Sequence, residues 1–219
     1  MTDPILALRR VNRKKRKLLV ASGAAVLAIG AGGAFTLMAV KDQTYVPSAP
    51  YEPHGALNSD VVVVYYSRSG HSEAVAREVA RTFNAAIARI DADYPRDFSG
   101  QRKAVSDARA KALPNIRVEP IDVAAARRVF LVSPTWMFRP ATPLWAYVEH
   151  ADFRGKEVLL IATGNSRFEQ AEIHAFAKRV EARGGRFVDH IFLRRGRIYW
   201  QKSREALLRQ LRMETERFQ

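Results

Sequence analysis

A hydroxyl-rich segment, Ser67-Arg68-Ser69-Gly70-His71-Ser72, has the residue types that bind a phosphate group. Its hydroxyls and backbone N–H groups are hydrogen-bond donors, and its glycine lets the backbone approach a ligand closely. Arg68 and His71 add positive charge. The segment lacks the Gly-Lys-Ser/Thr ending of the P-loop. It predicts a phosphate site, although such a turn also serves as an ordinary helix N-cap.

A second segment runs from Ser133 to Pro140 and suits a flat ring. Its candidate binding residues are Pro134, Thr135, Trp136, Met137 and Phe138. An apolar Trp-Met-Phe cluster between two prolines is unusual on an exposed loop, and a stacked aromatic ligand would explain it. The alternative is that Trp136 folds back onto the core.

A third segment, Thr163–Phe168, offers small polar residues for the edge of a heterocycle, and the candidates are Thr163, Gly164 and Asn165. By itself it also reads as a plain turn. Together the three segments supply phosphate donors, a stacking surface and polar edge contacts, in the order that a mononucleotide requires. We call residues 67–72, 133–140 and 163–168 the first, second and third loops.

Each loop directly follows an expected strand. Apolar, β-branched runs predict strands at Val61–Tyr66, Ala86–Ile90, Val129–Val132, Val158–Ala162 and Phe187–Leu193. Helical patterns lie between and after them, at Ser72–Phe83, Ser99–Leu113, Gln170–Arg183 and Ser203–Met213. Alternation of strands and helices predicts a doubly wound α/β domain with a five-stranded parallel sheet. Ligands of such sheets bind beyond the carboxyl ends of the strands, where these loops lie.

The three loops, taken in order, resemble those of the flavodoxin family. SRSGHS is similar to the family's phosphate loop, SPTWMFRPATPLWAYVE to its second loop and FRGKEVLLIATGNS to the stretch that leads into its third. The segment Asp93–Phe98 also has counterparts in the family. The resemblance covers nearly all of Val61–Met213.

This resemblance implies a flavodoxin-like fold with strand order 2-1-3-4-5, noncovalent FMN and electron transfer. The residues implied to hold the phosphate are Ser67, Ser69, Gly70 and Ser72. Trp136 would lie against the flavin ring, and Thr163, Gly164 and Asn165 would line its far edge. The flavin would carry the chemistry, so no catalytic side chain is expected. The chain would be an electron carrier or a flavin-dependent reductase.

Two departures from the family matter. Met137 and Phe138 stand where relatives often have a second aromatic residue and then glycine. The domain is also basic, whereas typical flavodoxins are acidic, so the sequence specifies neither the redox donor nor the acceptor. A degenerate fold that has lost FMN and serves as a binding module is the alternative, and Phe138 filling the place of the ring would favour it.

The N-terminal part of the chain predicts a membrane anchor. Leu18–Val40 contains no charged residue and is long enough to span a bilayer as a transmembrane helix, although a signal peptide is the competing interpretation. Seven Lys and Arg residues lie between Arg9 and Lys17, and only Lys41 follows the span closely. A cytoplasmic basic flank, 1–17, therefore places the linker, 41–59, and the domain, 60–219, outside the cytoplasm in a single-pass topology.

Composition excludes several classes of protein. The chain has 219 residues, a formal net charge of +14 and no cysteine, so disulfides and thiolate metal sites are absent. No pair of histidines has helical metal-ligand spacing, so no metal site is expected. The basic residues form no stripe interleaved with aromatics, and nucleic-acid binding is therefore not expected.

Overall fold

The computed structural model describes residues 44–196 and 200–219, with six isolated residues between 22 and 40. One compact unit comprises Asp42–Gln219. Within the described residues, no helix has the length and apolar character that crossing a membrane requires. The predicted basic flank, 1–17, lies outside the described residues, and so does nearly all of the predicted span, 18–40.

Strands and helices alternate through this unit. The strands are β1 (Asn58–Tyr65), β2 (Ala85–Ala92), β3 (Ile116–Val118), β4 (Arg128–Trp136), β5 (Arg139–Pro140), β6 (Glu157–Gly164) and β7 (Arg186–Arg194). The helices are α2 (His71–Phe83), α3 (Phe98–Ala110), α4 (Thr142–His150), α5 (Gln170–Ala182), α6 (Arg204–Thr215) and the short 3-10 helix η1 (Glu216–Phe218). The α/β class predicted from the sequence is confirmed.

The sheet has seven strands in the order β3-β2-β1-β4-β6-β7, with β5 paired to β4. The prediction of five strands in the order 2-1-3-4-5 was therefore wrong in strand count and incomplete in order. The two additional strands are antiparallel: β3 pairs with β2, and β5 pairs with β4. Both strands are too short to show an apolar pattern, and β5 also contains a proline. The sequence did not reveal them because their pairing depends on the neighbouring strand and not on local sequence.

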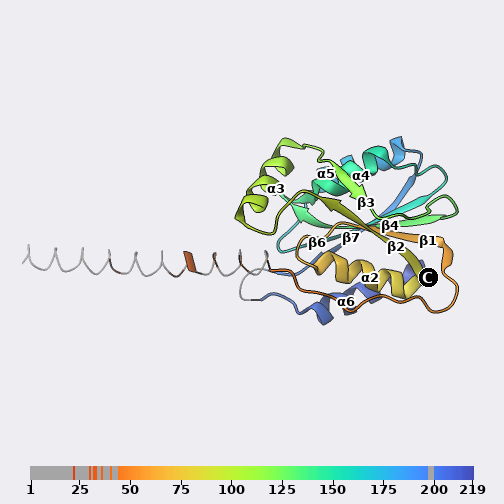
Figure 1. Ribbon diagram of the computed structural model, residues 1–219, viewed down its shortest axis with the longest axis horizontal. Coiled ribbons are helices and arrows are strands. Elements are labelled where there is room, and N and C mark those ends of the chain that lie inside the picture. The colour runs from red at the N-terminus through yellow and green to blue at the C-terminus, as the bar shows by residue number, and fades with distance from the viewer. Residues whose placement is uncertain are drawn as a thin grey trace, which may run out of the picture. The chain divides into compact units, whose positions relative to one another are not determined.

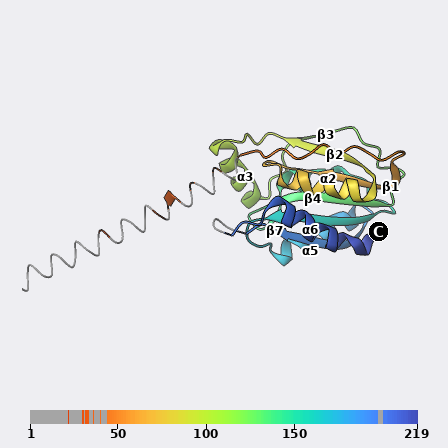
Figure 2. The same cartoon turned by 90° about the horizontal axis from the view of Figure 1, so that it is seen from below.

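Helices cover both faces of the sheet (Figures 1 and 2). On one face lie α3, α4 and α5, and on the other lie α2 and α6. Consecutive residues of β1 divide between the two layers: Val62 and Val64 belong to one core cluster, and Val61 and Val63 to the other. A strand buried on both faces explains why this run is uninterrupted by polar residues.

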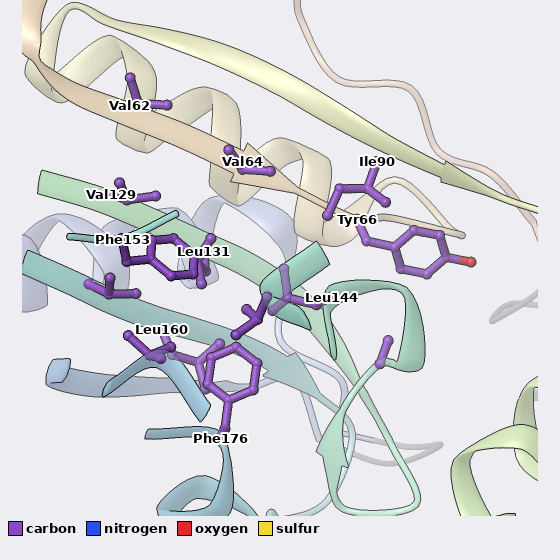
Figure 3. Close-up of a cluster of buried hydrophobic side chains, with 14 of the residues drawn as sticks. Val62, Val64, Tyr66, Ile90, Val129, Leu131, Leu144, Phe153, Leu160 and Phe176 are labelled. Carbon is purple, nitrogen blue, oxygen red and sulfur yellow. The ribbon is translucent and has the colours of Figure 1, made fainter. Parts of the chain in front are cut away.

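The larger cluster packs against α4 and α5. Figure 3 shows Leu131 of β4 and Leu160 of β6 on the same side of the sheet as Leu144 and Phe176 from these helices. All four side chains are fully buried. This packing fixes β4 and β6, the strands that carry the second and third loops, relative to one another.

Removing part of this core should destabilise the domain. Leu131→Ala is expected to lower the free energy of unfolding by about 2–5 kcal/mol, because it removes buried methyl groups and leaves a cavity. Chemical unfolding measures the change. Leu113→Ala is the matched control, since Leu113 is 50% exposed and its truncation should stay within about 0.5 kcal/mol of zero. Equal effects of the two substitutions would contradict this description of the core.

Candidate functional site

The three predicted loops meet at one edge of the sheet. β1 pairs in parallel with β4, and β4 pairs in parallel with β6, so the carboxyl ends of all three strands lie side by side. The first and third loops are joined directly by a hydrogen bond of 2.8 Å between the hydroxyls of Ser72 and Thr163. Both hydroxyls are nearly inaccessible to solvent. The strand pairing thus assembles segments that are about 100 residues apart in sequence.

A cavity of about 220 Å³ lies between these loops. Eleven of the fourteen residues predicted for the cofactor site line it: Arg68, Ser69, His71, Ser72, Pro134, Thr135, Trp136, Met137, Thr163, Gly164 and Asn165. Four further residues complete the lining: Gln101, Ala104 and Val105 from α3, and Arg195 after β7. The predicted residues Ser67, Gly70 and Phe138 do not line the cavity.

Ser67 and Gly70 shape the first loop from within. The Ser67 hydroxyl is buried and accepts a hydrogen bond of 3.1 Å from the Gly70 N–H. Gly70 has a φ of 85°, in the left-handed region that glycine adopts without strain, and α2 begins at the next residue. The turn therefore directs the N-terminus of α2 and the side chains of Ser69, His71 and Ser72 toward the cavity.

The second loop is a tight hairpin between β4 and β5. Its two central residues, Met137 and Phe138, have φ values of 48° and 68°, the conformation of a type I′ turn. Positive φ in two residues other than glycine is strained, and strain of this kind is concentrated at functional loops. Phe138 stacks under the Arg167 guanidinium at 4.7 Å, away from the cavity lining, while Met137 lines it. Phe138 therefore does not take the place of a ring.

Trp136 serves the core and the cavity together. Its ring meets Tyr66 at 5.4 Å and Tyr94 at 4.8 Å between centroids, in both cases edge-on. Tyr94 is held in turn, because its hydroxyl bonds to Asp107 (2.8 Å) and to Thr142 (3.0 Å). The two interpretations of Trp136 therefore hold together, because the indole packs on the core and also lines the cavity.

Arg195 is a site residue that the sequence interpretation missed. It is 8% exposed and lines the cavity. Its backbone N–H donates to the Gly164 carbonyl at 2.8 Å. The absence of a side chain at Gly164 lets the second loop lie close to the third, since a Cβ on Gly164 would lie 2.3 Å from the Thr135 hydroxyl. The signal was present in the sequence, because Arg195 follows a predicted strand just as the three loops do.

His71 is half-buried, and its inaccessible Nδ1 atom is suited to an anionic ligand. Burial, followed by the positive charges of Arg195 and Arg204, lowers the pKa of His71 to about 4. Among the described residues its Nδ1 atom has no hydrogen-bond partner. An unsatisfied ring nitrogen beside two guanidinium groups fits a phosphate, which would accept hydrogen bonds and offset the positive charge.

A larger cavity, about 760 Å³, lies at the opposite edge of the sheet, at the amino ends of the strands. It is rich in arginine, but its arginines have carboxylate partners, and Lys156 donates to two backbone carbonyls. Arg127 pairs with Asp60, and Arg128 and Arg186 pair with Glu157. The loops of the predicted site do not reach this cavity. The smaller cavity therefore remains the candidate site.

A family model described as flavodoxin matches residues 60–200. The chain belongs to the flavodoxin family. This match spans all three loops and confirms the resemblance seen in the sequence. No curated protein matches the chain.

Solved structures of flavoproteins share the flavodoxin fold of this chain. A flavoprotein from Lactobacillus acidophilus in complex with FMN is 18% identical, with a TM-score of 0.52, and the alignment covers 61% of this chain and 92% of that one. A candidate flavoprotein from Bacteroides eggerthii is 17% identical, with a TM-score of 0.54 and coverage of 71% and 98%. At these identities the likeness establishes the fold.

Two half-buried histidines, His71 and His190, predict how the stability of this flavodoxin-family domain depends on pH. The pKa values of His71 and His190 are both lowered to about 4, chiefly by burial. Between about pH 6.5 and pH 4 the unfolded chain binds protons that the folded chain does not. The free energy of unfolding should therefore fall as pH falls through this window, by at most about 1.4 kcal/mol per pH unit for each histidine.

Urea unfolding at several pH values between 7 and 4.5 measures this slope. His71→Gln and His190→Gln should each make it shallower, and the double variant should make it shallower still. A slope that is the same in the double variant as in the unaltered protein would contradict the assignment.

Proposed function

We propose that this protein binds FMN in the cavity between the three loops and works as an electron-transfer protein or a flavin-dependent reductase. The observation that carries the proposal is the convergence of hydroxyls, an unsatisfied histidine, an arginine and an indole on one cavity. Membership of the flavodoxin family and the FMN complex of the Lactobacillus acidophilus flavoprotein support it.

The phosphate would be held by the first loop. Ser69 and His71 line the cavity with polar atoms, and the N-terminus of α2 adds its positive end. The hydrogen bond between Ser72 and Thr163 uses one of their two O–H groups, so the pair keeps one donor for a ligand. Arg195 places a buried positive charge in the same lining.

The second and third loops would hold the ring. Trp136 offers an aromatic surface that Tyr66 and Tyr94 keep in place, and Asn165 offers an amide for the heterocycle edge. FMN, when bound, supplies one- or two-electron transfer, and the protein supplies binding, orientation and electrostatics. The cationic lining favours the negative charge that electron uptake adds, which is the opposite of the field of an acidic flavodoxin.

A second candidate function is a flavodoxin-like binding module that has lost FMN. The size of the cavity favours it, because 220 Å³ lies below the range of roughly 300–1,000 Å³ that is typical of ligand sites. Trp136 is also turned edge-on to two tyrosines. Binding of FMN would require the second loop to open, or the ring to remain partly in solvent.

Titration of the purified protein with FMN separates the two functions. The FMN-binding account predicts uptake of one equivalent, quenching of flavin fluorescence and a higher melting temperature. Trp136→Leu should restore much of the fluorescence of the bound flavin, because the indole lies in the cavity lining. Saturating FMN that changes neither fluorescence nor melting temperature would favour the module that has lost the cofactor.

Replacement of first-loop and cavity residues tests phosphate capture. Ser69→Ala and Arg195→Gln should weaken FMN binding by about 1.5–3 kcal/mol each and leave riboflavin binding nearly unchanged, since only FMN carries the phosphate. Calorimetric titration with both ligands measures this. Ser106→Ala is a matched control, because Ser106 is exposed on α3 outside the cavity lining. Equal weakening of FMN and riboflavin would show that these residues support the fold.

We also propose that Leu18–Val40 tethers the domain to a membrane, with the N-terminus in the cytoplasm and the domain outside it. The uncharged run and the cluster of Lys and Arg between Arg9 and Lys17 support this topology. Because FMN is made in the cytoplasm, a loaded domain would need a route for folded proteins. The Arg9-Arg10 pair before the apolar run points to a twin-arginine route.

Reporters fused after Gln219 test the topology. A reporter that is active only outside the cytoplasm should give the signal, and a cytoplasmic signal would contradict the proposal. Changing Arg9 and Arg10 together to Lys keeps the charge that sets the orientation. It should abolish export under the twin-arginine route and leave export unchanged under a route for unfolded chains.

A further inference from the structure

The segment Tyr45–Ala49, which we call the strap, lies against the first loop. The Val46 N–H donates to the Ser69 carbonyl at 3.1 Å. The Val46 carbonyl is so close to Gly70 that a Cβ on this glycine would lie 2.1 Å from the oxygen. Two consecutive residues of the first loop are thus in backbone contact with the strap, and only glycine fits at the second.

Arginines from two helices hold the strap at successive carbonyls. Arg204, at the start of α6, donates to the carbonyls of Val46 (2.8 Å) and Pro47 (2.6 Å). Arg77 of α2 donates to the carbonyls of Ser48 (2.8 Å) and Ala49 (3.0 Å). The planar guanidinium has donors arranged as a fork, and Arg204 uses both of its Nη atoms, one for each carbonyl, whereas Arg77 reaches both of its carbonyls with Nη1 alone. A lysine at position 204 would offer a single nitrogen in place of this fork.

Tyr45 ties the strap to the first turn of α2. Its hydroxyl donates to a carboxylate oxygen of Glu73 at 2.6 Å, and Glu73 is 1% exposed. The other carboxylate oxygen of Glu73 pairs with Arg77 at 2.6 Å, and the Arg96 guanidinium lies 4.2 Å from the centre of the Tyr45 ring. Val46 itself is 39% exposed. Polar contacts rather than apolar burial therefore fasten the strap.

The strap and one of the arginines that hold it lie outside the residues that the family model matches, whereas Arg77 and Glu73 lie inside them. The family match covers 60–200, whereas the strap precedes it and Arg204 follows it. We propose that the strap holds the first loop in its ligand-binding conformation, so that attachment of the strap and binding of FMN strengthen each other. This inference rests on the proposed FMN site, and it adds that the affinity for FMN depends on the strap.

Two substitutions loosen the strap without touching the cavity lining. Tyr45→Phe removes the bond to Glu73, and Arg204→Lys keeps the positive charge but loses the fork. Each should raise the Kd of FMN by about fivefold or more, the lower end of typical coupling between sites. Tyr51→Phe is the matched control: it removes a tyrosine hydrogen bond to Asn84, at the far end of α2, and should leave the Kd unchanged.

If Arg204 acted only through its charge, Arg204→Lys would bind FMN as the unaltered protein does. That result, together with unchanged affinity in Tyr45→Phe, would overturn the inference. An equal loss of affinity in Tyr51→Phe would also overturn it, because the effect would then be one of general stability.

Hydrogen exchange of the full chain tests the coupling from both directions. Without ligand, the amides of residues 69–72 should exchange about fivefold faster in Arg204→Lys than in the unaltered protein. FMN should slow exchange at the Val46 N–H, because coupling between two events is reciprocal. Unchanged exchange of the loop in Arg204→Lys would overturn the inference. If the unaltered protein takes up no FMN, the proposed function fails, and the ligand-free comparison still decides the role of the strap.

Discussion

The parallel pairing of β1, β4 and β6 is the constraint on which the candidate site depends. A shift of either pairing by one residue would move every side chain to the opposite face of its strand and displace one loop relative to the others. Burial on both faces of the sheet makes such a shift costly, because each strand fills two core layers. The hydrogen bond between Ser72 and Thr163, which joins the first and third loops, can form only in this register.

Positive charge lies around the first loop of this flavodoxin-family domain. Burial, followed by the positive charges of Arg195 and Arg204, lowers the pKa of His71 in the first loop to about 4, so that His71 is neutral near pH 7. An anion bound at the first loop would offset the positive charges of Arg195 and Arg204. The loop is also fixed from outside by polar contacts to the strap. Under the proposed function, the site would thus be prepared for a phosphate and would depend on its contacts with the strap.

The sequence predicted the α/β class, the five longer strands and the loops that line the cavity, because each depends on local pattern and on the rule that parallel strands place their carboxyl ends together. It did not predict β3, β5 or the roles of Arg195 and the strap. Each of these depends on contacts between distant segments, as when Arg204 meets Val46. The structure describes the second loop, where Phe138 stands at the position at which relatives often have glycine, and where Met137 and Phe138 both adopt strained positive φ angles.

Chemical-shift mapping by nuclear magnetic resonance tests most directly whether the three loops form one flavin site. One equivalent of FMN added to the isotopically labelled protein should shift the amides of Ser69–Ser72, Thr135–Met137 and Thr163–Asn165 together. The amides around the opposite cavity, at Gly155, Gly184 and Arg217, should stay in place. Shifts confined to the opposite cavity, or no shifts at saturating FMN, would contradict the account.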